Sequence, residues 1–206
     1  MMRGYLRSIA NSVKSFMMLA GQETPLVPRF PKVKDLIDRE GMLVEEVSET
    51  QEVIQKIEEL ISDGVPYSEI EQDTELLQEY ADGLLDVIYV AIGSLINVGI
   101  RPETQEALMQ MVCKANNAKF IKLHGVTHRR MHELADLTEK YPDRKIEVRQ
   151  DVLGNNYAAI TDLDNGKVKK PNDWQDPKAE MLEILEKSIA LGEQSYSASE
   201  LWGSTT

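Results

Sequence analysis

The sequence predicts an all-α helical bundle that carries a small excursion containing a β-hairpin. Three observations predict this class. Apolar residues from Leu36 to Ile61 recur at spacings of three, four and seven residues, which is the pattern of one long amphipathic helix. Residues 73–98 are apolar nearly all round, as in a buried helix. Only residues 145–162 show the pattern of strands around a turn.

The helices follow in order along the chain. Apolar residues between Leu6 and Ala20 stand at helical spacing and predict a first amphipathic helix. A breaker segment with three prolines, residues 21–31, separates it from the long helix, which begins near Val33. Asp63, Gly64 and Pro66 end that helix. The apolar helix of residues 73–98 comes next, and a further helix is expected over residues 103–114.

The later part of the chain changes character. Within an expected excursion, residues 121–163, we predict a helix over 124–141 and strands over 145–150 and 156–162, joined as a hairpin. A last helix over 177–191 precedes a Ser- and Gly-rich tail, residues 193–206, which we expect to be flexible. We expect residues 1–206 to form one domain.

Composition excludes several classes of protein. The 206 residues hold 23 Lys and Arg against 35 Asp and Glu, a net charge of −12, so we expect no nucleic-acid polymer as a partner. The single cysteine, Cys113, excludes a disulfide framework and a CxxC zinc site. No charge-free run approaches the roughly 18 residues of a membrane span, so we expect a cytoplasmic protein without a membrane partner.

The acidic residues are concentrated on the two long helices. Residues 35–86 hold 17 of the 35 acidic side chains but only Arg39 and Lys56 as bases. One subset reads EExxE and lies at the edge of the apolar stripe: Glu45, Glu46 and Glu49. A second subset shares one face of the apolar helix, which holds no base of its own: Glu79, Asp82 and Asp86. A buried carboxylate costs on the order of several kcal/mol unless it is paired or bound to metal.

Antiparallel packing of the two helices would bring both subsets to one pocket. Two helices joined by a short connector pack in this way. Carboxylate oxygens are hard ligands that suit Mg²⁺ or Mn²⁺, and Mg²⁺ also engages substrate phosphates. The acidic cluster therefore predicts a divalent metal site.

At these residues the sequence resembles the all-α nucleoside triphosphate pyrophosphohydrolases, the MazG-like group that includes phosphoribosyl-ATP pyrophosphohydrolase. The shared signature is EExxE followed by ExxD. Four blocks resemble consecutive blocks of the phosphoribosyl-ATP-pyrophosphohydrolase-like branch: MLVEEVSET (42–50), EYADGLLDVIYVAIGSLINVGI (79–100), ANNAKF (115–120) and NGKVKKPNDWQDP (165–177). The resemblance covers residues 16–120 and returns at 164–177. Residues 121–163 have no counterpart, and the gap between Glu49 and Glu79 is longer than usual.

The resemblance implies roles for individual residues. It implies Glu46, Glu49, Glu79 and Asp82 as ligands of Mg²⁺ or Mn²⁺. Glu45, with Glu46, is expected to take part in catalysis, and Glu45 or Asp86 would orient the attacking water or bind the ion indirectly. Binding of the triphosphate is assigned to Asn116, Lys119, Lys167 and Lys170.

The implied activity is hydrolysis of a nucleoside triphosphate, with purine deoxynucleotides among the candidates, to the monophosphate and pyrophosphate, in sanitation or remodelling of the nucleotide pool. Phosphoribosyl-ATP cleavage in histidine synthesis and a non-catalytic nucleotide-binding helical oligomer are the alternatives. Because the apolar helix cannot cover itself, we expect a homodimer or homotetramer that completes the bundle.

Other chemistry-bearing residues are left open by the sequence. His124, His128 and His132 are spaced by four, and HxxxH can chelate a transition metal. Gly125 weakens a helix there, and Arg129 and Arg130 would repel a cation, which favours a solvated or phosphate-facing patch. Tyr157 and Trp174 are candidates for stacking on a base or for packing.

Overall fold

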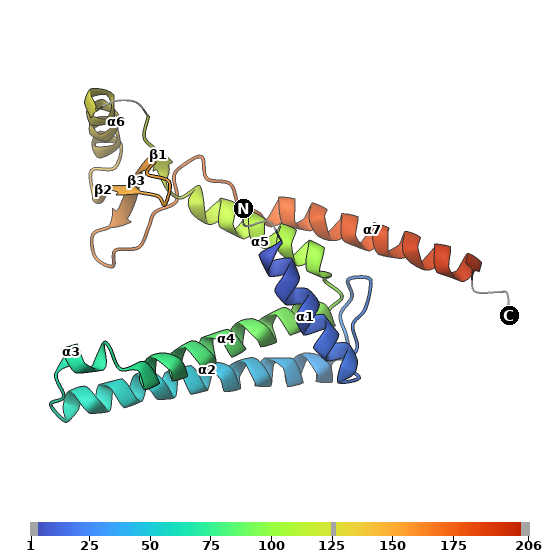
Figure 1. Cartoon of the computed structure of the whole chain (residues 1–206). Helices are drawn as coiled ribbons and strands as arrows, with labels where there is room; N and C mark the ends of the chain where they lie inside the picture. The colour runs from blue at the N-terminus through green and yellow to red at the C-terminus, as the bar shows by residue number, and fades with distance from the viewer. Residues whose placement is uncertain (1–3, 125–126, 203–206) are drawn as a thin grey trace. The chain divides into compact units, whose positions relative to one another are not determined.

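The computed structural model describes residues 4–124 and 127–202 (Figure 1). This part of the chain is mostly helical and carries one small antiparallel sheet. The helices are α1 (Tyr5–Leu19), α2 (Val33–Ser62), α3 (Tyr67–Ile70), α4 (Thr74–Asn97), α5 (Pro102–Asn117), α6 (Thr127–Lys140) and α7 (Lys178–Trp202). The strands are β1 (Ile121–Lys122), β2 (Arg144–Gln150) and β3 (Asn156–Asp162).

The chain divides into two compact units. The first unit runs from the N-terminus to Ala107 and includes the chain from Ile184 onward, and the second unit is Leu108–Glu183. The sequence predicted one domain with an excursion at residues 121–163, so the second unit is larger than that excursion. It also takes in the end of α5 and the NGKVKKPNDWQDP segment.

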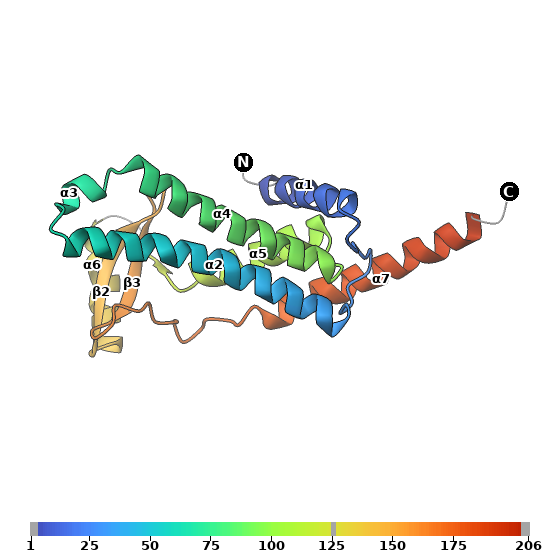
Figure 2. The ribbon, with the colours of Figure 1, turned by 90° about the horizontal axis from the view of Figure 1, so that it is seen from below.

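In the first unit, α2 and α4 lie side by side and antiparallel (Figures 1 and 2). α1 packs on the C-terminal half of α4 through a core of Ala10, Val13, Met17, Ile92 and Ile96. Asp73 fixes the start of α4, because its side chain accepts hydrogen bonds from the backbone N–H groups of Glu75 and Leu76.

A close backbone approach holds the proline-rich arm against the end of α4. Gly99 follows α4 with a φ of 77°, and a Cβ atom at this position would lie only 2.2 Å from the carbonyl oxygen of Val27. The backbone N–H of Arg29 donates to the carbonyl of Val98 at 3.0 Å. Only glycine permits both the left-handed conformation and this approach.

In the second unit, α6 packs on one face of a three-stranded antiparallel sheet of order β1-β3-β2. The core between them consists of Leu123, Leu137, Tyr141, Ala158 and Ile160. β2 and β3 form a hairpin in which Arg144 lies opposite Asp162 and Gln150 lies opposite Asn156. At the open end of the hairpin, Arg144 and Asp162 form an ion pair at 2.6 Å.

The structure confirms the expected long helices and the hairpin, with small shifts at their ends. It adds two short elements that the sequence analysis missed: α3, in the connector after α2, and β1. α7 runs to Trp202, past its expected end at residue 191 and into the tail that was expected to be flexible. Residues 203–206 lie outside the described part of the chain.

Taken singly, none of the described helices is long and apolar enough to cross a membrane. α4 and α5 reach the required length and hydropathy only as a pair, and the chain bends by 118° between them.

Candidate metal and nucleotide site

The register between α2 and α4 sets which acidic residues face each other. Gly83 of α4 lies against Thr50 of α2 so closely that a Cβ atom at Gly83 would stand 2.9 Å from Thr50 Oγ1. Thr50 is buried, and its hydroxyl donates back to the carbonyl oxygen of Glu46 at 3.0 Å. This contact places the EExxE segment of α2 opposite the stretch of α4 that begins at Asp82.

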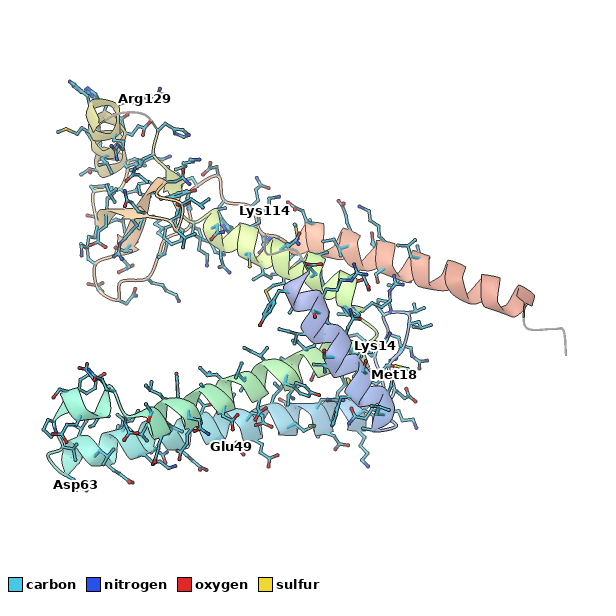
Figure 3. All side chains as sticks on the ribbon, in the orientation of Figure 1. Lys14, Met18, Glu49, Asp63, Lys114 and Arg129 are labelled. Atoms are coloured by element: carbon cyan, nitrogen blue, oxygen red, sulfur yellow. The ribbon has the colours of Figure 1, made fainter. Side chains whose placement is uncertain are left out.

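Glu46 is the half-buried member of the acidic cluster. Loss of hydration raises the pKa of Glu46, and the negative charges of four neighbouring carboxylates raise it further. In order of effect, these neighbours are Asp86, Glu49, Glu45 and Asp82. The structure therefore brings acidic side chains of both helices within electrostatic range of Glu46, as the sequence analysis expected. Figure 3 shows Glu49 near the middle of α2 and Asp63 at the end of that helix.

Glu79 lies elsewhere on the same pair of helices. Its Oε2 atom accepts a hydrogen bond from Lys56 Nζ of α2 at 2.5 Å, and this contact raises the pKa of Lys56. Both residues line a hollow of about 330 Å³ toward the α3 end of the helix pair. The apolar helix holds no base of its own, but Glu79 is paired with a base on the neighbouring helix α2.

The carboxylates around Glu46 are of the type that binds divalent metal ions, but their side chains do not converge on one point. In the described residues, no three Asp, Glu, His or Cys side chains stand close enough together to hold an ion as they are placed. Glu45, Glu49, Asp82 and Asp86 are exposed. A divalent cation would offset the repulsion that raises the pKa of Glu46, so the donor set fits Mg²⁺ or Mn²⁺.

The residues expected to bind phosphate all lie in the second unit. Asn116 and Lys119 stand on the last turn of α5 and just after it, and Lys119 Nζ donates to Asn116 Oδ1 at 2.7 Å. Lys167 is exposed, and its backbone carbonyl accepts from the N–H of Asp162 at 2.9 Å. The ammonium group of Lys170 lies 3.7 Å from the centre of the Trp174 ring.

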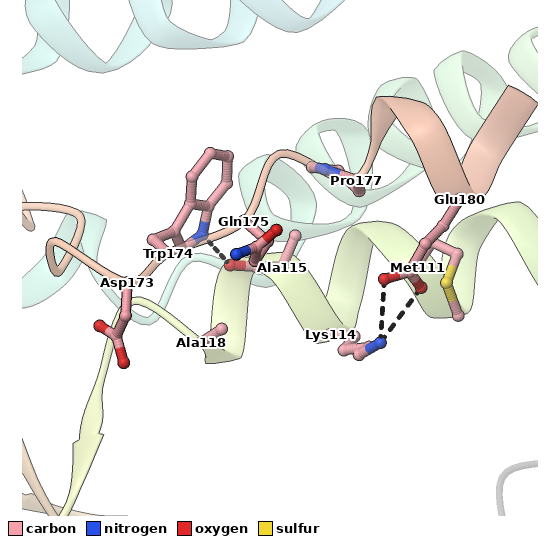
Figure 4. Close-up of a pocket in the computed structure, with 9 residues that line it drawn as sticks. All are labelled: Met111, Lys114, Ala115, Ala118, Asp173, Trp174, Gln175, Pro177 and Glu180. Carbon is pink, nitrogen blue, oxygen red and sulfur yellow. Dashed lines mark hydrogen bonds and ion pairs between the residues drawn. The ribbon is translucent and has the colours of Figure 1, made fainter.

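Trp174 has a packing role in this unit. Its indole N–H donates to the carbonyl oxygen of Ala115 in α5 at 2.8 Å (Figure 4). Nearby, Lys114 and Glu180 form an ion pair at 3.1 Å. Together these contacts tie the segment before α7, and the first turn of α7, to α5.

The three histidines do not form a metal site as placed. The rings of His128 and His132 stack in parallel with their centres 5.2 Å apart. The backbone N–H of His124 donates to Glu133, which also pairs with Arg129 at 3.6 Å. Gly125 lies outside the described residues.

Sequence reasoning did not identify Thr50, Gly83 and Lys56 as parts of this site. A glycine inside an otherwise apolar helix was the available signal for a close helix contact.

Comparison with known proteins identifies the family. The family model described as phosphoribosyl-ATP pyrophosphohydrolase matches residues 13–116, which include α2, α4 and all of the acidic cluster. No curated protein matches the chain. Since the match covers half of the 206 residues, the chain belongs to the phosphoribosyl-ATP pyrophosphohydrolase family, which indicates a pyrophosphohydrolase that acts on a nucleotide.

Proposed function

We propose that the protein hydrolyses a (deoxy)nucleoside triphosphate between the α and β phosphorus atoms and releases the monophosphate and pyrophosphate. The observation that carries this proposal is the set of four carboxylates around half-buried Glu46, drawn from two facing helices in the region that matches the family. A cation bound among these carboxylates would relieve the repulsion that raises the pKa of Glu46.

Glu46, Glu49, Asp82 and Asp86 would hold Mg²⁺ or Mn²⁺. When bound, such an ion neutralises phosphate charge and lowers the pKa of a bound water. Asp86 takes the place that the sequence analysis gave to Glu79, because Asp86 exerts the largest effect of any charged neighbour on Glu46 while Glu79 is paired with Lys56. Glu45 would accept a hydrogen bond from the attacking water and orient it toward the α-phosphorus.

We further propose that the active protein is a homo-oligomer. Apolar side chains stand exposed along both acidic helices, among them Val44, Leu85 and Ile88, with exposed fractions of 62%, 62% and 50%. A second copy would cover this surface and complete the four-helix bundle.

Phosphoribosyl-ATP is the second candidate substrate. The name of the matching family favours it, and the same cleavage between the α and β phosphorus atoms applies. A metal ion held by the carboxylates would engage the polyphosphate part that both candidates share, so the acidic residues do not separate the two substrates.

Release of pyrophosphate tests the proposal. The purified full chain is incubated with Mg²⁺ and with each dNTP, each NTP or phosphoribosyl-ATP in turn. We expect release from at least one nucleoside triphosphate and none after addition of EDTA. Release from phosphoribosyl-ATP alone would transfer the function to the second candidate, and release from no substrate would refute both.

A further inference from the structure

We propose that the second unit contains a nucleotide-binding pocket of its own, in which Tyr157 and Phe120 hold a base while Arg149 and Lys122 hold its phosphate. The pocket lies on the sheet, in the part of the chain that follows the family match at residues 13–116. Its binding would need no metal, so this proposal goes beyond the hydrolytic site and does not depend on it.

The pocket is built from the ends of three elements. Asn117 is the last residue of α5, and Phe120 lies in the turn before β1. Arg149 and Gln150 end β2, Asp151 follows directly after it, and Tyr157 comes from β3. Its volume is about 260 Å³. Pockets for drug-sized ligands have volumes of roughly 300–1,000 Å³. This pocket is therefore suited to one planar ring system, and the rest of the ligand would lie outside it.

The strand register sets cations on both sides of Tyr157. Tyr157 pairs with Lys122 of β1 on one side and with Arg149 of β2 on the other. Residues that lie directly opposite on paired strands share a face of the sheet. α6 covers the other face, where Ala158 and Ile160 are fully buried. The row from Lys122 through Tyr157 to Arg149 therefore lies on the face that α6 leaves open.

Neighbouring acidic groups hold the ring and the guanidinium in place. Tyr157 hydrogen-bonds to Asp151, whose oxygens also accept from Asn155 and from the backbone N–H of Leu153. Arg149 donates to Glu147 at 2.5 Å, and Lys145 pairs with the other oxygen of Glu147 at 2.7 Å. The two carboxylates are thus occupied. Among the described residues the ammonium group of Lys122 has no side-chain partner, so Lys122 and the Arg149 donors that do not face Glu147 can bind an anion.

Charge favours an anionic ligand at this unit. Residues 108–183 hold 13 Lys and Arg against 12 Asp and Glu, whereas the rest of the chain holds 10 against 23. A phosphate is therefore repelled far less by the second unit than by the first.

The mixture of groups points to a nucleotide. Aromatic rings stack on any base, and a guanidinium binds phosphate oxygens in a fork. The side-chain amide of Asn117 offers both a donor and an acceptor to the edge of a base, and it forms no hydrogen bond with the described residues. Trp174, the other candidate for stacking, has its N–H bonded to Ala115 and Lys170 over its ring, so Tyr157 is the ring left for a ligand.

Calorimetric titration of the full chain in EDTA tests the pocket. AMP, GMP, CMP and UMP are compared with the corresponding nucleosides. We expect Tyr157→Ala to weaken binding of the best monophosphate by roughly 5-fold to 100-fold, the loss typical of one stacked base. Tyr157→Phe keeps the stacking ring and loses only the hydrogen bond to Asp151, so it should bind within a few-fold of the wild type. Arg149→Gln should remove the preference for the monophosphate over its nucleoside.

Matched variants separate this pocket from the hydrolytic site and from general charge loss. Arg129→Gln removes a similarly exposed arginine of the same unit, and Tyr67→Ala removes an exposed tyrosine of α3; both should bind normally. Glu46→Gln should also bind normally, even if no nucleotide is ever hydrolysed. If Tyr157→Ala loses the circular dichroism of the folded chain, Arg149→Gln and Phe120→Leu carry the test. The proposal is overturned if no monophosphate binds at millimolar concentration, if Arg149→Gln and Phe120→Leu bind like the wild type, or if only single-stranded oligonucleotides bind.

Discussion

At the scale of single residues, Glu46 carries the strongest prediction, because its raised pKa means that its charged form is disfavoured in the folded protein. In the absence of metal at pH 7, Glu46→Gln should therefore raise the thermal midpoint, since it removes repulsion from Asp86 and the other carboxylates. The same substitution removes a proposed ligand, so turnover should fall by about 100-fold or more. Differential scanning calorimetry and pyrophosphate release measure the two effects.

Glu79→Gln is the matched variant. It breaks the ion pair with Lys56. The thermal midpoint should stay unchanged or fall slightly, because an exposed ion pair contributes little to stability. Turnover should stay within a few-fold of the wild type. Turnover as low as that of Glu46→Gln would show that Glu79 is needed for catalysis, as expected of a metal ligand.

Glu147 gives a pH prediction. Hydrogen bonds from Lys145 and Arg149 lower the pKa of Glu147 to about 2. Because this lies below the value of about 4.3 for an unfolded glutamate, its contribution to stability is present above pH 4.3 and is lost as the pH falls toward 2. Glu147→Gln should lower the urea midpoint slightly at pH 7 and low salt. The difference from wild type should shrink as the pH falls through that window, and an equal difference at pH 7 and pH 3 would contradict this origin.

At the scale of elements, the contact of Gly83 with Thr50 sets the register of α2 and α4. A Cβ atom at Gly83 would displace the Thr50 hydroxyl from the Glu46 carbonyl, so Gly83→Ala should destabilise the helix pair by about 1 kcal/mol or more, despite the better helix propensity of alanine. Gly41→Ala, in α2 with open space around it, should instead stabilise by about 0.5–1 kcal/mol. Urea unfolding measures the difference in stability between the two variants. Equal stabilisation by both would show that the contact of Gly83 with Thr50 leaves room for a methyl group.

The same contact explains how far the sequence could predict the site. Periodicity was sufficient for α2 because its sequence carries a long apolar stripe, and it placed Glu46 at the edge of that stripe, whereas α4 was recognised by its nearly continuous apolar sequence. Helical spacing fixes the direction of a side chain around its own axis, but it does not fix how far two helices slide past each other. The family resemblance and the shared face of α4 assigned Glu79 to the cluster; in the structure Glu79 pairs with Lys56, and Asp86 is the charged neighbour with the largest effect on Glu46. α3 and β1, with four and two residues, are too short for any period to be seen.

At the scale of the whole molecule, the exposed apolar side chains of α2 and α4 bear on the proposed oligomer. Leu85 and Ile88 of α4 have exposed fractions of 62% and 50%. The sequence of α4, which is apolar nearly all round, had predicted a buried helix. Burial of one such side chain contributes about 1.5–3 kcal/mol, and in a two-fold symmetric interface each residue is buried twice. Leu85→Lys combined with Ile88→Lys should thus weaken self-association by more than about a hundredfold.

Light scattering at micromolar concentration measures this effect, with Val152→Lys as the control. Val152 is fully exposed in the loop between β2 and β3, so a lysine there adds charge without touching the acidic helices. We expect the wild type and Val152→Lys to have the mass of a dimer or a tetramer, and the double variant to have the mass of one chain. Because every copy in such an assembly brings its own α2 and α4, the double variant also tests whether a lone helix pair can hold its carboxylates in place. A monomeric wild type that still releases pyrophosphate would show that the pair suffices and that the apolar surface has another use.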